Sequence, residues 1–107
     1  MTWRATGIGL QDLPPGSKKE VLVEGHPVLL LHHMEQVYAT AARCTHSQGP
    51  LVDGKLQGNR LTCPRHGAVF DIKSGIVLQG PYGAMKTREL TIYPARVQDG
   101  SIEVDIP

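Results

Sequence analysis

The sequence predicts an all-β protein, and three observations support this prediction. Twelve glycines and eight prolines interrupt the 107-residue chain too often for long helices. Short runs rich in Val, Ile, Leu and Thr lie between these breaks, as strands do. No segment repeats its apolar residues with the period of about 3.6 residues that marks an amphipathic helix. At this length we expect a single domain.

The N-terminal part is expected to contain four strands joined by turns. The turn-rich segment 12–16, with two prolines and a glycine, follows the first strand. Gly25-His26-Pro27 separates the second strand from the third and favours a hairpin. Met34-Glu35 forms a second tight connection. The four predicted strands cover residues 3–8, 20–24, 28–32 and 36–40.

The C-terminal part is expected to contain three more strands. Its last segment alternates Ile, Val and Ile with polar neighbours, which is typical of a half-buried strand. The turn Gln98-Asp99-Gly100 precedes that segment. The predicted strands cover residues 89–93, 96–97 and 101–106.

Residues 41–83, between the two groups of strands, are predicted to be irregular. This segment is rich in glycine and proline and contains both cysteines of the chain, Cys44 and Cys63. A loop-rich insert of this length in a small β domain normally has a function of its own.

Charge and hydropathy exclude several kinds of partner. Eleven basic and ten acidic residues give a net charge of +1, so nucleic acid and membrane surfaces are not expected as partners. The N-terminus lacks the basic and apolar regions of a signal peptide. The longest aliphatic run, Val28–Leu31, is too short to cross a bilayer. We therefore expect a soluble, cytoplasmic protein, and a monomer.

The two cysteines each have a histidine nearby. The pattern is Cys44-x-His46, then sixteen residues, then Cys63-x-x-His66. In a reducing compartment this pattern favours metal ligation or catalysis over a disulfide. Two sulfur and two nitrogen donors suit either a tetrahedral, redox-silent zinc ion or a [2Fe-2S] cluster with two histidines on one iron. A cysteine nucleophile with a histidine base is the third interpretation, although nothing obvious orients such a base.

The residues around both pairs resemble the Rieske family of iron–sulfur proteins. CTHSQGPL, from Cys44, resembles the first cluster loop, and CPRHGAVFDIKSG, from Cys63, resembles the second. The proline-bearing segment 78–82 resembles a third loop that covers the cluster in this family. The resemblance extends over nearly the whole chain and is to a stand-alone Rieske ferredoxin.

This resemblance implies a fold, a cofactor and a set of site residues. Residues 1–107 would form one Rieske domain, an antiparallel base with a loop-rich cluster-binding subdomain inserted at approximately 41–83. One [2Fe-2S] cluster would be bound per chain. Cys44 and Cys63 would bind one iron, and His46 and His66 the other. The surrounding residues implied by the resemblance are Ser47, Gln48, Gly67, Ala68, Phe70 and Pro81.

The chain also departs from the respiratory Rieske proteins. Gly49 and Arg65 occupy the positions of their loop-clamping disulfide. Ala68 and Phe70 occupy positions where a serine and a tyrosine donate hydrogen bonds to sulfur. Neutral imidazole ligands raise the potential of such a cluster into a range of about −150 to +300 mV. Without the two hydroxyls, we expect this chain to be a low-potential member of the family.

The resemblance implies an electron-transfer protein, not an enzyme. It would carry single electrons from an NAD(P)H-dependent flavoprotein reductase to the terminal oxygenase of a dioxygenase system. The alternative is the small Rieske-like subunit of an assimilatory nitrite reductase. His26, His32 and His33 are expected to be solvated hairpin residues and not a second metal site, because neighbours on a strand point to opposite faces.

Overall fold

The computed structural model describes residues 3–43, 50–64, 67–80 and 89–106, and here the predicted all-β class is confirmed. The described residues form eleven strands, two short 3-10 helices, η1 (Leu10–Asp12) and η2 (Leu51–Asp53), and no α-helix. They contain no helix long and apolar enough to cross a membrane. The strands are β1 (Trp3–Gly9), β2 (Lys18–Val23), β3 (His26–His33), β4 (Gln36–Ala41), β5 (Lys55–Gln57), β6 (Arg60–Thr62), β7 (Val69–Asp71), β8 (Val77–Gln79), β9 (Ile92–Tyr93), β10 (Ala95–Gln98) and β11 (Ser101–Asp105).

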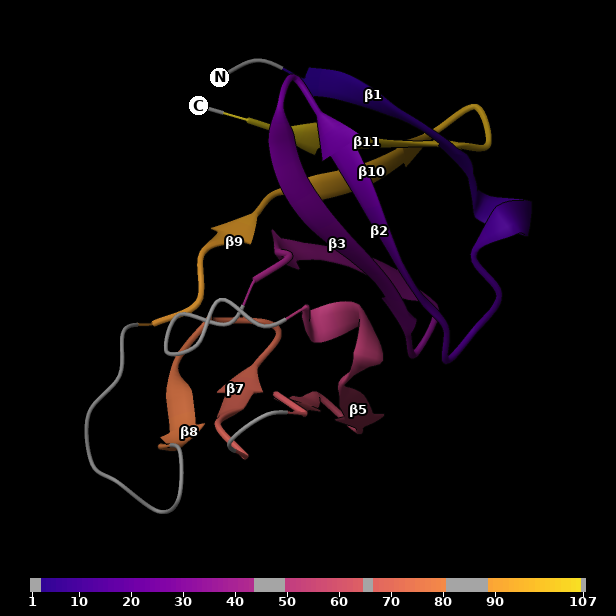
Figure 1. The fold of residues 1–107 in the computed structure, drawn as a ribbon. Helices are drawn as coiled ribbons and strands as arrows, with labels where there is room; N and C mark the ends of the chain where they lie inside the picture. The colour runs from indigo at the N-terminus through magenta and orange to yellow at the C-terminus, as the bar shows by residue number, and fades with distance from the viewer. Residues whose placement is uncertain (1–2, 44–49, 65–66, 81–88, 107) are drawn as a thin grey trace.

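The strands form three antiparallel sheets (Figure 1). One has the order β1-β11-β10, the second β2-β3-β4-β9, and the third β5-β6-β7-β8. The first two sheets share a hydrophobic core, which we call the base core, and together they form the base of the molecule. The buried residues of the base core are Leu13, Val23, Val28, Leu30, Ala39, Ile102, Val104 and Ile106.

A second hydrophobic core, the loop core, joins the third sheet to the base. Its buried residues are Leu29, Leu31, Ala42, Leu51, Leu61, Cys63, Ala68, Phe70, Ile72 and Leu90. Strand β3 contributes to both cores, because Val28 and Leu30 belong to the base core and Leu29 and Leu31 to the loop core. Alternate side chains of a strand point to opposite faces, so a strand covered on both faces needs a continuous apolar run.

Two-residue turns connect the hairpins of the base. Glu24 and Gly25, with φ of 51° and 80°, connect β2 to β3, and Met34 and Glu35, with φ of 53° and 66°, connect β3 to β4. Positive φ at both central residues is the geometry that fits the twist of a hairpin. Both predicted hairpins are confirmed, but the first turn is shorter than expected, because His26 and Pro27 already belong to β3.

The prediction that residues 41–83 are irregular is wrong. Strands β5 to β8 form a regular sheet within this range, with residues 57 and 60, 62 and 69, and 70 and 77 paired across neighbouring strands. Each strand has only three residues, which is too few for an alternating pattern to stand out from the surrounding glycines and prolines. The predicted strand 89–93 is also shorter, since only Ile92–Tyr93 is assigned to β9.

His32 is not the solvated residue that the sequence suggested. Its side chain is buried, and Nδ1 lies 2.7 Å from the backbone carbonyl oxygen of Leu13. This contact connects β3 to the segment that follows η1. The carbonyl partner satisfies a buried ring nitrogen that would otherwise carry a desolvation cost. His26 and His33 are partly exposed.

Candidate metal centre

The second predicted loop begins where β6 ends. Thr62 pairs with Val69 across β6 and β7, and two backbone hydrogen bonds extend this pairing into the loop. The Cys63 amide donates to the Ala68 carbonyl at 2.7 Å, and the Gly67 amide donates to the Cys63 carbonyl at 3.2 Å. Gly67 has a φ of 79°, which glycine adopts at little cost. The β6-β7 ladder thus fixes both ends of the loop, while His66 lies outside the described residues.

Cys63 lies in an apolar environment. It exposes 1% of its surface and belongs to the loop core together with Ala68 and Phe70, which expose none. Burial of this kind disfavours an isolated thiolate, because the charge loses its hydration. A thiolate at Cys63 therefore needs a compensating cation, and metal ions are the soft cations that thiolates bind in proteins. The residue fits the role of an iron ligand.

The first predicted loop is closed at its base in a similar way. Arg43 forms an antiparallel bridge with Pro50, and the Leu51 amide donates to the Ala42 carbonyl at 2.9 Å. Ala42 and Leu51 are both buried in the loop core. The two ends of the loop are consequently held side by side on the same core as Cys63. The predicted site residues of this loop, Cys44, His46, Ser47 and Gln48, lie outside the described residues.

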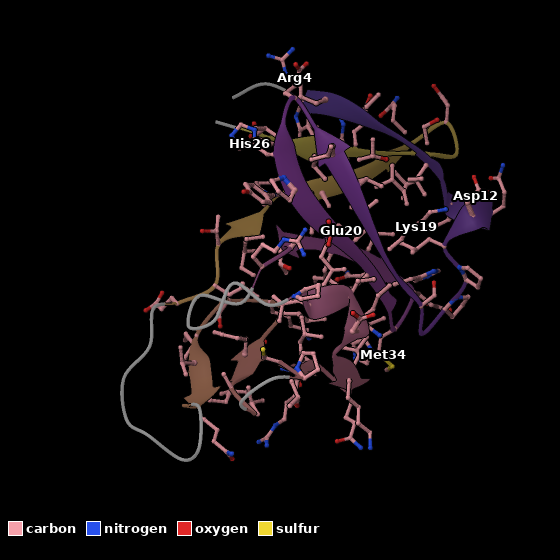
Figure 2. The ribbon with its side chains drawn as sticks, in the orientation of Figure 1. Arg4, Asp12, Lys19, Glu20, His26 and Met34 are labelled. Carbon is pink, nitrogen blue, oxygen red and sulfur yellow. The ribbon has the colours of Figure 1, made fainter. Side chains whose placement is uncertain are left out.

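An ion pair connects the base of the first loop to β2. The Arg43 guanidinium lies 3.2 Å from the Glu20 carboxylate, and both side chains are partly exposed. Figure 2 shows Glu20 on β2, above η2. A pair with this exposure contributes at most about 1 kcal/mol to stability. The ion pair also positions Arg43, the residue that immediately precedes Cys44, against β2.

The third predicted loop, 78–82, begins later than expected, because Leu78 and Gln79 belong to β8. Gly80, which follows β8, and Leu90 are both buried. The Leu90 amide donates to the Gly75 carbonyl at 2.8 Å. Gly75 has a φ of 81°, and a Cβ atom there would collide with the Leu90 carbonyl oxygen. Only glycine fits this close approach of two backbones. Pro81, the predicted cover of the site, lies outside the described residues.

Asp71 organises the turn between β7 and β8. Its carboxylate accepts hydrogen bonds from the Asn59 side chain at 3.1 Å, the Lys73 amide at 3.0 Å and the Ser74 hydroxyl at 3.1 Å. The Lys73 amide is the main reason that the pKa of Asp71 lies below its ordinary value, and the Ser74 and Asn59 side chains lower it further. The same turn presents Gly75 to Leu90. Asp71 lies in the stretch CPRHGAVFDIKSG that resembles the second cluster loop, but its hydrogen-bond partners could not be predicted from the sequence.

The stems of all three loops therefore meet on one core. Ala42 and Leu51 come from the first loop, Cys63 and Ala68 from the second, and Leu90 from the third. Four of the ten predicted site residues are described, namely Cys63, Gly67, Ala68 and Phe70. Within the described part of the chain, no group of three or more His, Cys, Asp or Glu side chains is placed to hold a metal ion. The arrangement of the complete ligand set stays a prediction.

Comparison with known proteins identifies a family. The Rieske [2Fe-2S] domain matches residues 8–94. The ferredoxin component of the naphthalene 1,2-dioxygenase system of Pseudomonas aeruginosa is 30% identical over 99 residues, which cover 92% of this chain and 91% of that protein. The ferredoxin subunit of 3-phenylpropionate/cinnamic acid dioxygenase from Escherichia coli is 33% identical over 90% of this chain and 87% of that protein.

Solved structures agree with this assignment. A ferredoxin from Sphingomonas yanoikuyae superposes with a TM-score of 0.84 at 27% identity, and the match covers 97% of each chain. A chain in the complex of reduced oxygenase and oxidised ferredoxin of carbazole 1,9a-dioxygenase superposes with a TM-score of 0.82 at 29% identity, covering 95% of this chain and 91% of that one.

Proposed function

Because the chain belongs to the Rieske [2Fe-2S] domain family, we propose that it is a one-electron carrier that delivers electrons to the terminal oxygenase of a dioxygenase system. One observation carries the proposal. The chain matches ferredoxin components over about nine tenths of both lengths, 92% of this chain and 91% of the Pseudomonas protein, so the similarity spans most of that ferredoxin component. The activity of such a ferredoxin component is electron transfer.

The cofactor of this family is a [2Fe-2S] cluster, which stores and releases a single electron when it is bound. We assign the four ligands to Cys44, His46, Cys63 and His66. Support comes from the described stems of the two loops that bear these residues, which lie on one apolar core that also contains Cys63. The two backbone hydrogen bonds at the base of the second loop position the Cys63 side chain for such a role.

The low potential expected from the sequence is supported by the surroundings of Cys63. Ala68 and Phe70 are fully buried beside it in the loop core and offer no hydroxyl donor. Hydrogen bonds from hydroxyls to cluster sulfurs stabilise the more negative, reduced state. Their absence at these two positions favours a carrier that gives up its electron readily.

The donor and acceptor of the electron are protein partners. Solved complexes of carbazole 1,9a-dioxygenase pair a ferredoxin with an oxygenase, and one ferredoxin chain of this kind resembles the present chain. We propose an oxygenase as acceptor and an NAD(P)H-dependent flavoprotein reductase as donor. The relatives described above are dioxygenase ferredoxins, which favours this role over that of a nitrite reductase subunit.

Reconstitution tests this function directly. The purified protein is added to the reductase and oxygenase of the naphthalene system, from which the ferredoxin has been left out, and substrate-dependent NADH oxidation is followed. We expect turnover to return with the wild-type chain and to stay absent with a Cys63→Ser variant. A coulometric titration should count one reversible electron per chain. A protein that takes up no electron, with zinc bound instead of iron, would contradict the proposal.

A further inference from the structure

The small net charge of the chain hides a strong asymmetry. Residues 41–90 contain seven basic and three acidic side chains, whereas the rest of the chain contains four basic and seven acidic ones. The first segment includes β5 to β8, and the second includes all strands of the base except the last residue of β4. Figure 1 shows β5, β7 and β8 at the end of the molecule away from β1 and β11. The described residues of 41–90 carry four basic and three acidic side chains, against four and seven in the rest of the chain. The end of the molecule that includes β5 to β8, which we call the loop end, is therefore more positive than the base.

A partner protein can interact with the charge of the loop end separately from the charge of the base. The molecule is 42 Å long in its longest dimension. At physiological ionic strength the field of an exposed charge is screened over about 8 Å. A protein that approaches the loop end therefore meets the local positive charge and not the net charge of +1.

Two described basic residues of the loop end, Lys55 and Arg60, lie on the outer face of the third sheet. Leu56 and Leu61 pack on the loop core, and their neighbours Lys55 and Arg60 point to the opposite face and are exposed. Lys55 is paired with Thr62 across β5 and β6. Since Thr62 immediately precedes Cys63, Lys55 lies beside the base of the second loop.

These basic side chains are not neutralised by neighbours in the described structure. The ion pairs seen there are Arg4–Glu24, Arg43–Glu20 and Arg96–Glu103, and none of them includes Lys55 or Arg60. Asp71 is paired with Arg60 across β6 and β7. No ion pair joins its carboxylate to Arg60 among the described residues, and the carboxylate instead accepts hydrogen bonds from Asn59, Lys73 and Ser74.

We propose that the loop end docks on an acidic surface of the terminal oxygenase and that Lys55 and Arg60 steer this encounter. The inference rests on the proposed function, because it takes the loop end as the place where the electron leaves. Complementary charge raises the association rate and also orients the approach, since the negative base is repelled from the same surface. The surface of the oxygenase that accepts the loop end is accordingly expected to be rich in Asp and Glu.

Small redox reagents of opposite charge test the sign of the local field. The reduced protein is mixed by stopped flow with ferricyanide, a trianion, or with tris(phenanthroline)cobalt(III), a trication, over a range of ionic strengths. Each complex takes one electron, so its metal is reduced as the protein is reoxidised. We expect the ferricyanide rate constant to fall as salt is added and the cobalt rate constant to rise.

Two double variants with the same loss of net charge separate local from global electrostatics. Lys55→Gln/Arg60→Gln removes two exposed charges from the loop end, and Arg4→Gln/Lys19→Gln removes two from β1 and β2. Figure 2 shows Arg4 at the far end of the base. At low ionic strength the first variant should lose about threefold or more in the ferricyanide rate constant. The second should stay close to wild type, and all three proteins should converge at high salt.

Poly-L-glutamate extends the test to an acidic polypeptide. It should slow the ferricyanide reaction of the wild type and of Arg4→Gln/Lys19→Gln, and it should have little effect on Lys55→Gln/Arg60→Gln. Equal losses in both double variants, or a cobalt rate constant that falls with salt, would overturn the inference while reversible one-electron reduction is intact. Absence of that reduction would overturn the proposed function, and the inference with it.

Discussion

The side chains nearest to Cys63 set the electrostatic environment of the proposed ligand. Ala68 and Phe70 are apolar and fully buried, so neither side chain can donate a hydrogen bond to a sulfur atom. Changing one methyl hydrogen of Ala68 to a hydroxyl is the smallest chemical change that adds a donor here. A tyrosine at Phe70 is riskier, because its hydroxyl would enter the loop core and needs a partner there.

Ala68→Ser should raise the reduction potential. A hydroxyl that donates to sulfur gains strength when the sulfur becomes more negative on reduction. If the bond is about 1 kcal/mol stronger in the reduced state, the scale of about 59 mV per tenfold change in equilibrium constant gives roughly 40 mV. Redox titration measures this shift. Ala39→Ser is the control, because it also buries a hydroxyl, but in the base core, and should leave the potential unchanged.

Asp71→Asn should lower stability at neutral pH by about 1–2 kcal/mol, because a charged acceptor is replaced by a neutral one. The folded state lowers the pKa of Asp71, so its contribution is present above the unfolded pKa and is lost as the pH falls through the folded pKa. The gap between wild type and variant should therefore close as the pH falls from about 5 to below 4.

The measurement is the urea midpoint for loss of the visible absorbance of the holoprotein at several pH values. Asp53→Asn is the control, since Asp53 is exposed and no described group hydrogen-bonds its carboxylate. A gap that stays constant with pH would show that the Asp71 carboxylate does not carry the effect.

Single residues differ in how far the sequence could define their roles. The types and spacing of Cys44, His46, Cys63 and His66 indicate metal chemistry because few other functions need these donors together. The buried role of His32 could not be predicted, because its partner is a backbone carbonyl of Leu13, nineteen residues earlier. Long-range partners of this kind leave no local pattern.

At the scale of elements, the turn from Asp71 to Gly75 fixes the third loop to the second. Gly75 meets Leu90 backbone to backbone, at the point where the chain leaves the third loop. Gly25 has nearly the same φ, 80° against 81°, but nothing lies within 4 Å of the position that its Cβ would take. Substitutions at the two glycines therefore distinguish the free-energy cost of a side chain at positive φ from the cost of a steric clash with the Leu90 backbone.

Gly75→Ala should be clearly more harmful than Gly25→Ala. Both variants carry the penalty of about 1 kcal/mol for a side chain at positive φ. Only Gly75→Ala also forces the Leu90 backbone away, with a further cost of about 1–3 kcal/mol. We expect a small fall in the urea midpoint for Gly25→Ala, and a larger fall together with lower iron content for Gly75→Ala. Equal losses in the two variants would mean that the contact with Leu90 does not hold the loop.

The elements of the base were easier to predict than those around the loops. Strands β2, β3 and β4 have six to eight residues, and their apolar runs and turn residues stand out in the sequence. Strands β5 to β8 have three residues each, and their order depends on packing of Leu61 and Phe70 in the loop core. Tertiary contacts, rather than local preference, define such short strands.

At the scale of the molecule, strand β3 belongs to both the base core and the loop core. Strand β3 buries Val28 and Leu30 on one side and Leu29 and Leu31 on the other, so the two cores are mechanically continuous. The sequence showed this run as aliphatic but could not show that both faces were covered, because a continuous apolar run has no periodicity. Metal binding and folding should be coupled through this shared strand.

The central claim is that the two loops hold a Rieske cluster, and electron paramagnetic resonance of the dithionite-reduced protein tests it most directly. We predict a rhombic signal with the low average g value of Rieske centres, in a protein that contains two irons and two sulfides per chain, as a cluster with two histidine ligands on one iron requires. A silent spectrum from a protein with stoichiometric zinc, or the signal of an all-cysteine cluster, would contradict the account.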